Sequence, residues 1–99
     1  MFKHVVTFKF KGSLEERTKV AKDFAEALVQ LPDRIPELKS IEVGLNVNPV
    51  EEWDLVLIAV ADSLEDIAIY SAHPAHQEAV EIIAPYKDSR ACVDFEFIP

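Results

Sequence analysis

Two histidines and a tyrosine lie within seven residues of one another in the segment YSAHPAH, which runs from Tyr70 to His76. The whole chain has only three histidines and two tyrosines. A neutral histidine can remove a proton as a general base, and a tyrosine hydroxyl can hydrogen-bond the oxyanion that results. Two histidines three positions apart could instead bind a metal ion. The segment is therefore a candidate for acid–base chemistry, for a metal site, or for a helix junction without chemistry.

Pro74 divides this segment into two parts. Proline is favoured in the first turn of a helix, and the residue before it avoids helical backbone angles. We therefore expect His73 to belong to a junction and His76 to lie in the first turn of a restarted helix. His76 would share an inward face with Ala79, Val80 and Ile83. Burial and the positive end of the helix dipole both disfavour an imidazolium, so this histidine is predicted to be a neutral base.

Tyr70 and His4 are expected to complete the cluster. A kink at Pro74 could bring the hydroxyl of Tyr70 near the imidazole of His76, and these two form the predicted catalytic pair. His4 lies on the apolar face of an N-terminal strand. If that face meets the helices, all three side chains converge on a mostly apolar pocket that could bind a small ligand. The residues predicted to line this pocket, besides His4, are Val6, Phe8, Phe24, Leu28 and Leu57.

The same residues also permit purely structural roles. His4 could be a packed core histidine with one hydrogen bond, and His73 could cap a helix. Tyr70 could belong to the core with its hydroxyl at the surface. Nothing in the pattern of the segment alone decides between these roles and catalysis.

A metal site has weaker support. Pro74 gives His73 and His76 different local geometries, and neither a cysteine pair nor a His-Glu-x-x-His motif accompanies them. Cys92, the single cysteine, lacks a histidine motif that would mark it as a catalytic thiol. We predict no metal and no cofactor, since a proton beside a carbonyl group is acidic enough for a positioned base.

Changes in hydrophobic period predict the elements that would position these residues. Strand-like segments alternate between apolar and polar residues or are apolar on both faces. Helical segments follow cap signals: Ser13 with Glu16, and Asp62 with Glu65. The predicted strands cover 2–11, 39–47, 53–61 and a last segment around 91–97, and the predicted helices cover 14–31, 62–72 and 74–83.

This order of elements, βαββαβ, predicts a ferredoxin-like α+β fold with a four-stranded antiparallel sheet and helices on one face. The segment 53–61 is apolar on both sides and should be central. A chain of 99 residues has no third layer to cover the second face. We therefore predict a homodimer in which two sheets face each other as an α/β barrel. The alternative is a monomer whose second face is only moderately apolar.

Composition limits the possible partners. Residues 1–99 are enough for a single domain. A net charge of −8 argues against nucleic acid and against a polybasic membrane anchor. One cysteine cannot form an internal disulfide, which favours a reducing compartment. The N-terminal segment has no apolar core of a signal peptide, and no run approaches the ~20 apolar residues of a membrane span. A cytoplasmic protein is expected.

Three segments of the chain resemble a known family. KHVVTFKFK at the start, YSAHPAH in the middle and DFEF near the end are similar to the stress-responsive dimeric α/β barrel domain, Dabb. The resemblance extends over essentially the whole chain and implies the dimeric ferredoxin-like fold. In a plant member, olivetolic acid cyclase, the matching segment catalyses an intramolecular aldol condensation. Its catalytic histidine and tyrosine fall on His76 and Tyr70, and a pocket histidine falls on His4.

Two functions are consistent with the sequence. The first is binding of a small hydrophobic, carbonyl-containing molecule, with cofactor-independent chemistry of the aldol or cyclase type. The alternative is a non-catalytic, stress-responsive dimer in which the histidines are structural.

Overall fold

Four strands and three main helices make up the computed structural model, which describes residues 1–99. The order βαββαβ holds, with the second helical region split in two, and it confirms the predicted ferredoxin-like α+β fold. The strands are β1 (Phe2–Phe10), β2 (Ser40–Leu45), β3 (Leu55–Ala61) and β4 (Lys87–Glu96). The helices are α1 (Leu14–Leu28), α2 (Leu64–Ala72) and α3 (Pro74–Ile83), with short 3₁₀ turns at Leu31–Asp33 and Ala84–Tyr86.

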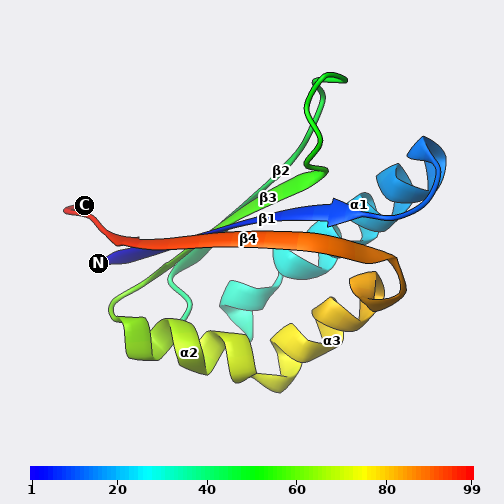
Figure 1. The fold of residues 1–99 in the computed structure, drawn as a ribbon. Helices are drawn as coiled ribbons and strands as arrows, with labels where there is room; N and C mark the ends of the chain where they lie inside the picture. The colour runs from blue at the N-terminus through cyan, green and yellow to red at the C-terminus, as the bar shows by residue number, and fades with distance from the viewer.

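The strands form one antiparallel sheet in the order β2-β3-β1-β4, so β1 and β3 are central. All three helices lie on the same side of this sheet (Figure 1). The two ends of the chain lie side by side, where the backbone N–H of Phe97 donates to the carbonyl of Met1. The central strands alternate strictly between buried residues that face the helices and half-buried residues that face away.

The hydrophobic core fills the space between sheet and helices. Phe24 and Leu28 of α1 are completely buried against it, as is Ile83 of α3. Complete burial of one such side chain stabilises the fold by about 1.5–3 kcal/mol. The sheet contributes Val6, Phe8, Phe10, Leu55, Leu57 and Ala59 to the same cluster.

The opposite side of the sheet, which we call the open face, carries no helix (Figure 1). Register places Val5, Ile58 and Val93 next to one another across β1, β3 and β4, with Val56 and Phe95 nearby. Val93 is 64% exposed and Phe95 is 43% exposed. The predicted second apolar face is therefore present on the sheet.

Several element ends differ from the sequence prediction, and β4 begins at Lys87 rather than around residue 91. α1 ends at Leu28 rather than 31, because the chain turns into a 3₁₀ segment that contains Pro32. The strands around the hairpin stop at Leu45 and resume at Leu55, shorter than predicted. There the side-chain amide of Asn46 donates to the carbonyls of Asn48 and Glu51, which holds the loop in a closed, non-strand conformation. The predicted antiparallel hairpin itself is confirmed.

One predicted cap is confirmed and one is wrong. The hydroxyl of Ser13 accepts from the N–H of Glu16, and the Glu16 carboxylate accepts from the N–H of Ser13, each at 3.1 Å. For α2 the cap is Ser63 rather than Asp62: the Ser63 hydroxyl accepts from the N–H of Asp66 at 3.1 Å. Asp62, one residue before the cap, forms an exposed ion pair with Lys39 across the neighbouring loop at 3.6 Å. None of the helices combines the length and the apolar character that a membrane span requires.

The cap assignment can be tested by two single substitutions. Ser63→Ala should lower the free energy of unfolding by about 1 kcal/mol, because an N–H at the start of α2 loses its acceptor. Asp62→Ala should change it by less than about 0.5 kcal/mol, since it removes only an exposed ion pair. Urea unfolding of the two variants measures both values. The opposite ranking would show that Asp62 caps the helix after all.

Candidate functional site

The break between α2 and α3 is built around Pro74. His73, immediately before it, has an extended backbone (φ −63°, ψ 136°), as expected for a residue that precedes proline. Its Nδ1 accepts a hydrogen bond from the N–H of Ala75 at 3.0 Å. His73 is thus the N-cap of α3, and the predicted place of His73 in the junction is confirmed.

His76, in the first turn of α3, reaches back across the break. Its Nδ1 lies 2.9 Å from the backbone carbonyl of Ser71. Ser71 is among the last residues of α2, whose carbonyls have no partner within the helix. Because a carbonyl oxygen can only accept, Nδ1 of the neutral imidazole carries the hydrogen and Nε2 keeps its lone pair. Nε2 has no hydrogen-bond partner in the chain, so the geometry leaves a basic nitrogen available.

Electrostatics keeps His76 neutral. Burial lowers the pKa of His76 below its ordinary value of 6.5. The hydrogen bond to Ser71 opposes this shift, while positive charge on His4 and Arg90 adds to it. At neutral pH the side chain is therefore an imidazole rather than an imidazolium, as a general base must be.

Tyr70, in the last turns of α2, packs directly against His76. The two ring centroids are 4.5 Å apart, with the ring planes tilted by 55°. The tyrosine ring also meets His4 edge to face, with centroids 6.1 Å apart. The three side chains predicted to converge do so, and Tyr70 is at their centre.

The hydroxyl of Tyr70 is unusual because it is buried and has no hydrogen-bond partner. A buried hydroxyl without a partner costs about 1–3 kcal/mol of stability, so this one is an exception to the general rule for polar groups. Burial also raises the pKa of Tyr70 well above its ordinary value of 10. The group therefore stays protonated and can donate a hydrogen bond to any acceptor that reaches it.

His4, on β1, completes the cluster and is only 6% exposed. Its Nδ1 lies 2.5 Å from the carboxylate of Asp94 and 3.4 Å from the sulfur of Cys92. Cys92 belongs to no histidine-containing sequence motif, yet His4 lies next to it in the structure. The antiparallel pairing of β1 with β4 brings together residues that are 88 positions apart in the chain.

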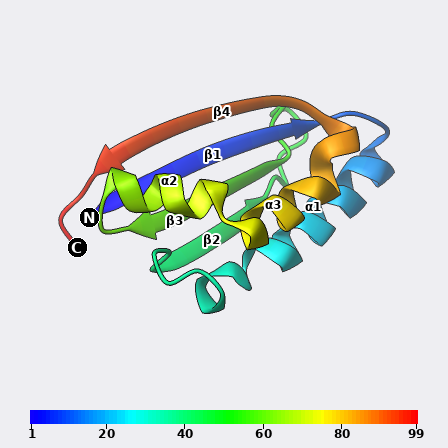
Figure 2. The same cartoon turned by 90° about the horizontal axis from the view of Figure 1, so that it is seen from below.

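Sequence analysis missed Arg90 and Asp94 as neighbours of the site. With Cys92 they form a polar row at every second residue of β4, and register places this row on the same face as His4. The row is exposed because the helices lie over the other strands and leave β4 largely uncovered (Figure 2). The alternation itself was the available signal, but it does not say which face of β4 meets the helices.

The residues predicted to line the pocket lie in the packed core. Val6, Phe8, Phe24, Leu28 and Leu57 are between 0% and 5% exposed and belong to one continuous cluster. None of them lines any of the four main cavities of the structure. Their role as pocket residues stays a prediction.

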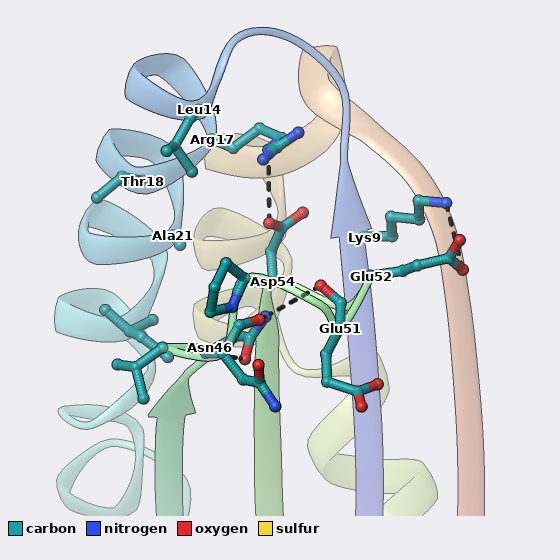
Figure 3. A pocket seen from close by; sticks show the side chains of 13 residues that line it. Lys9, Leu14, Arg17, Thr18, Ala21, Asn46, Glu51, Glu52 and Asp54 are labelled. Carbon is teal, nitrogen blue, oxygen red and sulfur yellow. Dashed lines mark hydrogen bonds and ion pairs between the residues drawn. The ribbon is translucent and has the colours of Figure 1, made fainter.

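A cavity of about 480 Å³ lies elsewhere, between the start of α1 and the loop that joins β2 to β3 (Figure 3). Its two cations are already paired. Nε of Arg17 lies 3.5 Å from the Asp54 carboxylate, and Nζ of Lys9 lies 3.8 Å from that of Glu52. It contains no histidine or tyrosine and leaves no cation free for a ligand, so the cluster around Tyr70 is the better candidate site.

Comparison with known proteins assigns the family. Residues 2–97 match the model of the Stress Responsive A/B Barrel Domain, Dabb, and the chain belongs to this family. No curated protein matches the chain.

Solved structures agree with this assignment. A dimeric protein of unknown function with a ferredoxin-like fold, from Bacteroides fragilis NCTC 9343, is 45% identical with a TM-score of 0.94, covering 97% of this chain and 95% of its own. A dimeric ferredoxin-like protein of unknown function from Thermobifida fusca YX is 28% identical, with a TM-score of 0.81 and coverage of 97% and 90%. Hydroxynitrile lyase from Passiflora edulis shares the fold at 17% identity, with a TM-score of 0.75 and coverage of 99% and 96%.

The neutral state of His76 predicts a specific pH dependence of stability. The unfolded chain binds a proton at this histidine more readily than the folded chain does, so stability should be complete above pH 6.5 and should fall as the pH drops below it. His76→Asn keeps a donor for the Ser71 carbonyl but does not titrate. Urea unfolding of wild type and variant, at one fixed protein concentration and from about pH 5 to 7.5, gives the free energy of unfolding at each pH. A wild-type-minus-variant difference that is constant with pH would contradict it.

Proposed function

We propose that this Dabb protein performs cofactor-independent acid–base chemistry on a small hydrophobic carbonyl compound. His76 is the base and Tyr70 is the hydrogen-bond donor to the carbonyl oxygen. The observation that carries the proposal is the unpartnered, buried hydroxyl of Tyr70, packed against a neutral imidazole whose Nε2 is free. A carbonyl oxygen is the kind of acceptor that this hydroxyl lacks.

The reaction begins with proton abstraction. Nε2 of His76 takes a proton from the carbon beside the carbonyl group. The electron pair of that C–H bond forms the C=C bond of the enolate, and the π electron pair of the C=O bond moves onto the oxygen. The O–H of Tyr70 hydrogen-bonds the enolate oxygen as its charge develops. In a compound with a second carbonyl group, the enolate carbon attacks that carbon and forms a C–C bond. The new alkoxide then takes the proton back from the imidazolium, which restores the neutral base.

The surroundings favour an apolar substrate. Tyr70 is buried among core side chains, and low polarity there strengthens each hydrogen bond to a developing charge. The exposed row on β4 lies beside His4, whereas His4 and Tyr70 themselves are only 6% and 1% exposed. The resemblance of the YSAHPAH segment to that of olivetolic acid cyclase also supports carbonyl chemistry, without naming the substrate.

A second candidate function is that of a non-catalytic dimer with structural histidines. The observation in its favour is the dense packing of the residues predicted to line the pocket. In addition, His4 and His76 each hold a hydrogen bond within the chain, to Asp94 and to Ser71. In this case the Tyr70 hydroxyl has no ligand to meet, and its burial is only a cost to stability.

We also propose that the protein forms a homodimer through the open face of the sheet. Val5, Ile58 and Val93 would meet the same residues of a second copy about a two-fold axis, and both apolar faces would leave water. Support comes from the dimeric state of the similar proteins from Bacteroides fragilis and Thermobifida fusca. The helix side, with Tyr70 and His76, stays outside this contact.

The catalytic proposal can be tested without knowing the substrate. Acetophenone, a hydrophobic methyl ketone, is incubated with the protein in D₂O, and loss of its methyl proton signal is followed by NMR. The wild type should exchange these protons faster than buffer does. His76→Asn should reduce the catalysed rate by about 100-fold or more, the usual contribution of a general base. Tyr70→Phe should reduce it by about 100-fold, as expected when one oxyanion donor is lost.

Two controls separate chemistry from folding. Tyr70→Phe breaks no hydrogen bond, so its free energy of unfolding should equal or exceed that of the wild type. His73→Ser removes the neighbouring imidazole but keeps an N-cap, so exchange should be unaffected. The test extends to dimethyl-substituted and longer ketones. If none of these compounds, acetophenone included, exchanges protons faster with the wild type than with His76→Asn, the non-catalytic function is favoured.

The dimer is tested by placing a charge on the open face. Val93→Glu should convert the protein to a monomer, because the interface would otherwise bury an unpaired carboxylate. Val47→Glu is the matched control, since Val47 is 94% exposed in the loop after β2. Sedimentation equilibrium gives the mass of each. A wild-type mass of one chain, or a dimeric Val93→Glu variant, would rule out this interface.

A further inference from the structure

A second group of chemically reactive side chains lies beside His4 and is not used by the proposed acid–base chemistry. Nδ1 of His4, Sγ of Cys92 and a carboxylate oxygen of Asp94 all lie within 4.8 Å of one another. We propose that these three atoms form a binding site for a zinc ion or a similar transition-metal ion, with the fourth position open. Sequence analysis considered only His73 and His76 as ligands, and the structure engages Nδ1 of each in a hydrogen bond to the backbone.

The site follows from strand register. His4 and Asp94 are direct partners across the β1–β4 pair, and Cys92 is two residues from Asp94 on the same face of the sheet. Side chains of such neighbours point the same way and are close enough to share a ligand. Two of the three donors come from one strand and the third from the central strand beside it. A β-sheet therefore holds the donors in place, rather than a mobile loop.

The distances between the donors fit a tetrahedral ion. Zinc bonds of about 2.0–2.3 Å at tetrahedral angles place neighbouring ligand atoms about 3.3–3.8 Å apart. Sγ of Cys92 lies 3.4 Å from Nδ1 of His4 and 3.6 Å from the Asp94 oxygen. Only the His4–Asp94 distance, 2.5 Å, is shorter, because a hydrogen bond joins these atoms in the absence of an ion. Entry of the ion requires this one pair to separate by about 1 Å.

The charge and softness of the donors also suit zinc. A thiolate, a carboxylate and a neutral imidazole carry two negative charges, which balance a divalent cation. Binding replaces the proton of the thiol and the proton that joins His4 to Asp94, so both are released to solvent. Arg90, on the same row of β4, is the one nearby cation that opposes binding, since its charge acts on Cys92.

Access to the site is open on one side. His4 is buried, whereas Cys92 and Asp94 are exposed. No helix lies over β4 (Figure 2). A site with three protein ligands and one accessible position is typical of zinc that exchanges or binds a further molecule, rather than of a closed structural site. The open face proposed for dimer contacts is on the other side of the sheet. A dimer therefore leaves this site free.

The test uses untagged, reduced full-length protein and metal ions alone. Zinc titration against a chromophoric chelator should show one ion bound per chain. Co²⁺ in place of zinc should give the strong visible bands of a tetrahedral ion and a near-ultraviolet thiolate charge-transfer band. Cys92→Ser should abolish the charge-transfer band and weaken zinc binding by at least about 100-fold, since even the loss of an outer hydrogen-bond partner weakens metal sites by about 10–100-fold.

Matched variants show which residues hold the ion. Asp94→Asn should also weaken binding, whereas Asp88→Asn, an exposed aspartate on the same strand, should bind as the wild type does. Circular dichroism establishes that Cys92→Ser and Asp94→Asn are folded. His76→Asn should retain full zinc affinity, so the ion site and the acid–base site can fail independently. Absence of stoichiometric zinc, or equal affinity in wild type and Cys92→Ser, would overturn the proposal.

Discussion

The candidate site depends on the missing N–H of Pro74. Because proline cannot donate and disfavours helical angles before it, α2 stops at Ala72 and α3 begins two residues later. The Ser71 carbonyl is left at a helix end, and His76 occupies it through Nδ1. One hydrogen bond thereby fixes the tautomer of His76, points its other nitrogen away from the backbone, and holds its ring on Tyr70. Without the break, residues 70 and 76 of a continuous helix would lie on different faces.

β4 differs from its neighbour β1 in the side of the sheet that its apolar residues face. In β1 the more apolar residues face the helices, and β3 is apolar on both faces. In β4 the residues on the helix side are Arg90, Cys92 and Asp94, while Val93 and Phe95 face the other way. The side of β4 that faces the helix layer is therefore polar and lies beside His4. No helix extends far enough to cover it (Figure 2). The open face gains a continuous apolar surface instead, which a second sheet can cover.

Tyr70 connects stability and function in this protein. Its ring is part of the core and helps to hold α2 on the sheet, but its hydroxyl has no partner. A phenylalanine would pack as well without the cost of burying a free donor. A buried hydroxyl without a partner in the chain calls for a partner from outside it, such as an ordered water or a ligand. The shared fold gives no such argument, since proteins with this fold have unrelated activities.

Sequence patterns alone determined the elements and their order. Alternation in residues 2–10 and 55–61, the capping box at Ser13 and the proline at position 74 are local signals, and each depends on residues close in the chain. They also determined the roles of His73 and His76 at the junction. Competition between two possible caps for α2 could not be settled locally, because Asp62 and Ser63 are adjacent and both residue types are favoured at the N-cap.

Only the tertiary structure decided which distant residues meet. Strand register put Asp94 and Cys92 next to His4, and no pattern within β4 specifies the partner residue on β1. The sequence also does not specify packing density. Apolar residues such as Phe24 and Leu28 could line a cavity or fill a core, and the structure places them in the core. A sequence fixes local backbone preferences through short-range sterics and hydrogen bonds, whereas contacts between strands and the free space between layers arise only when all elements are packed together.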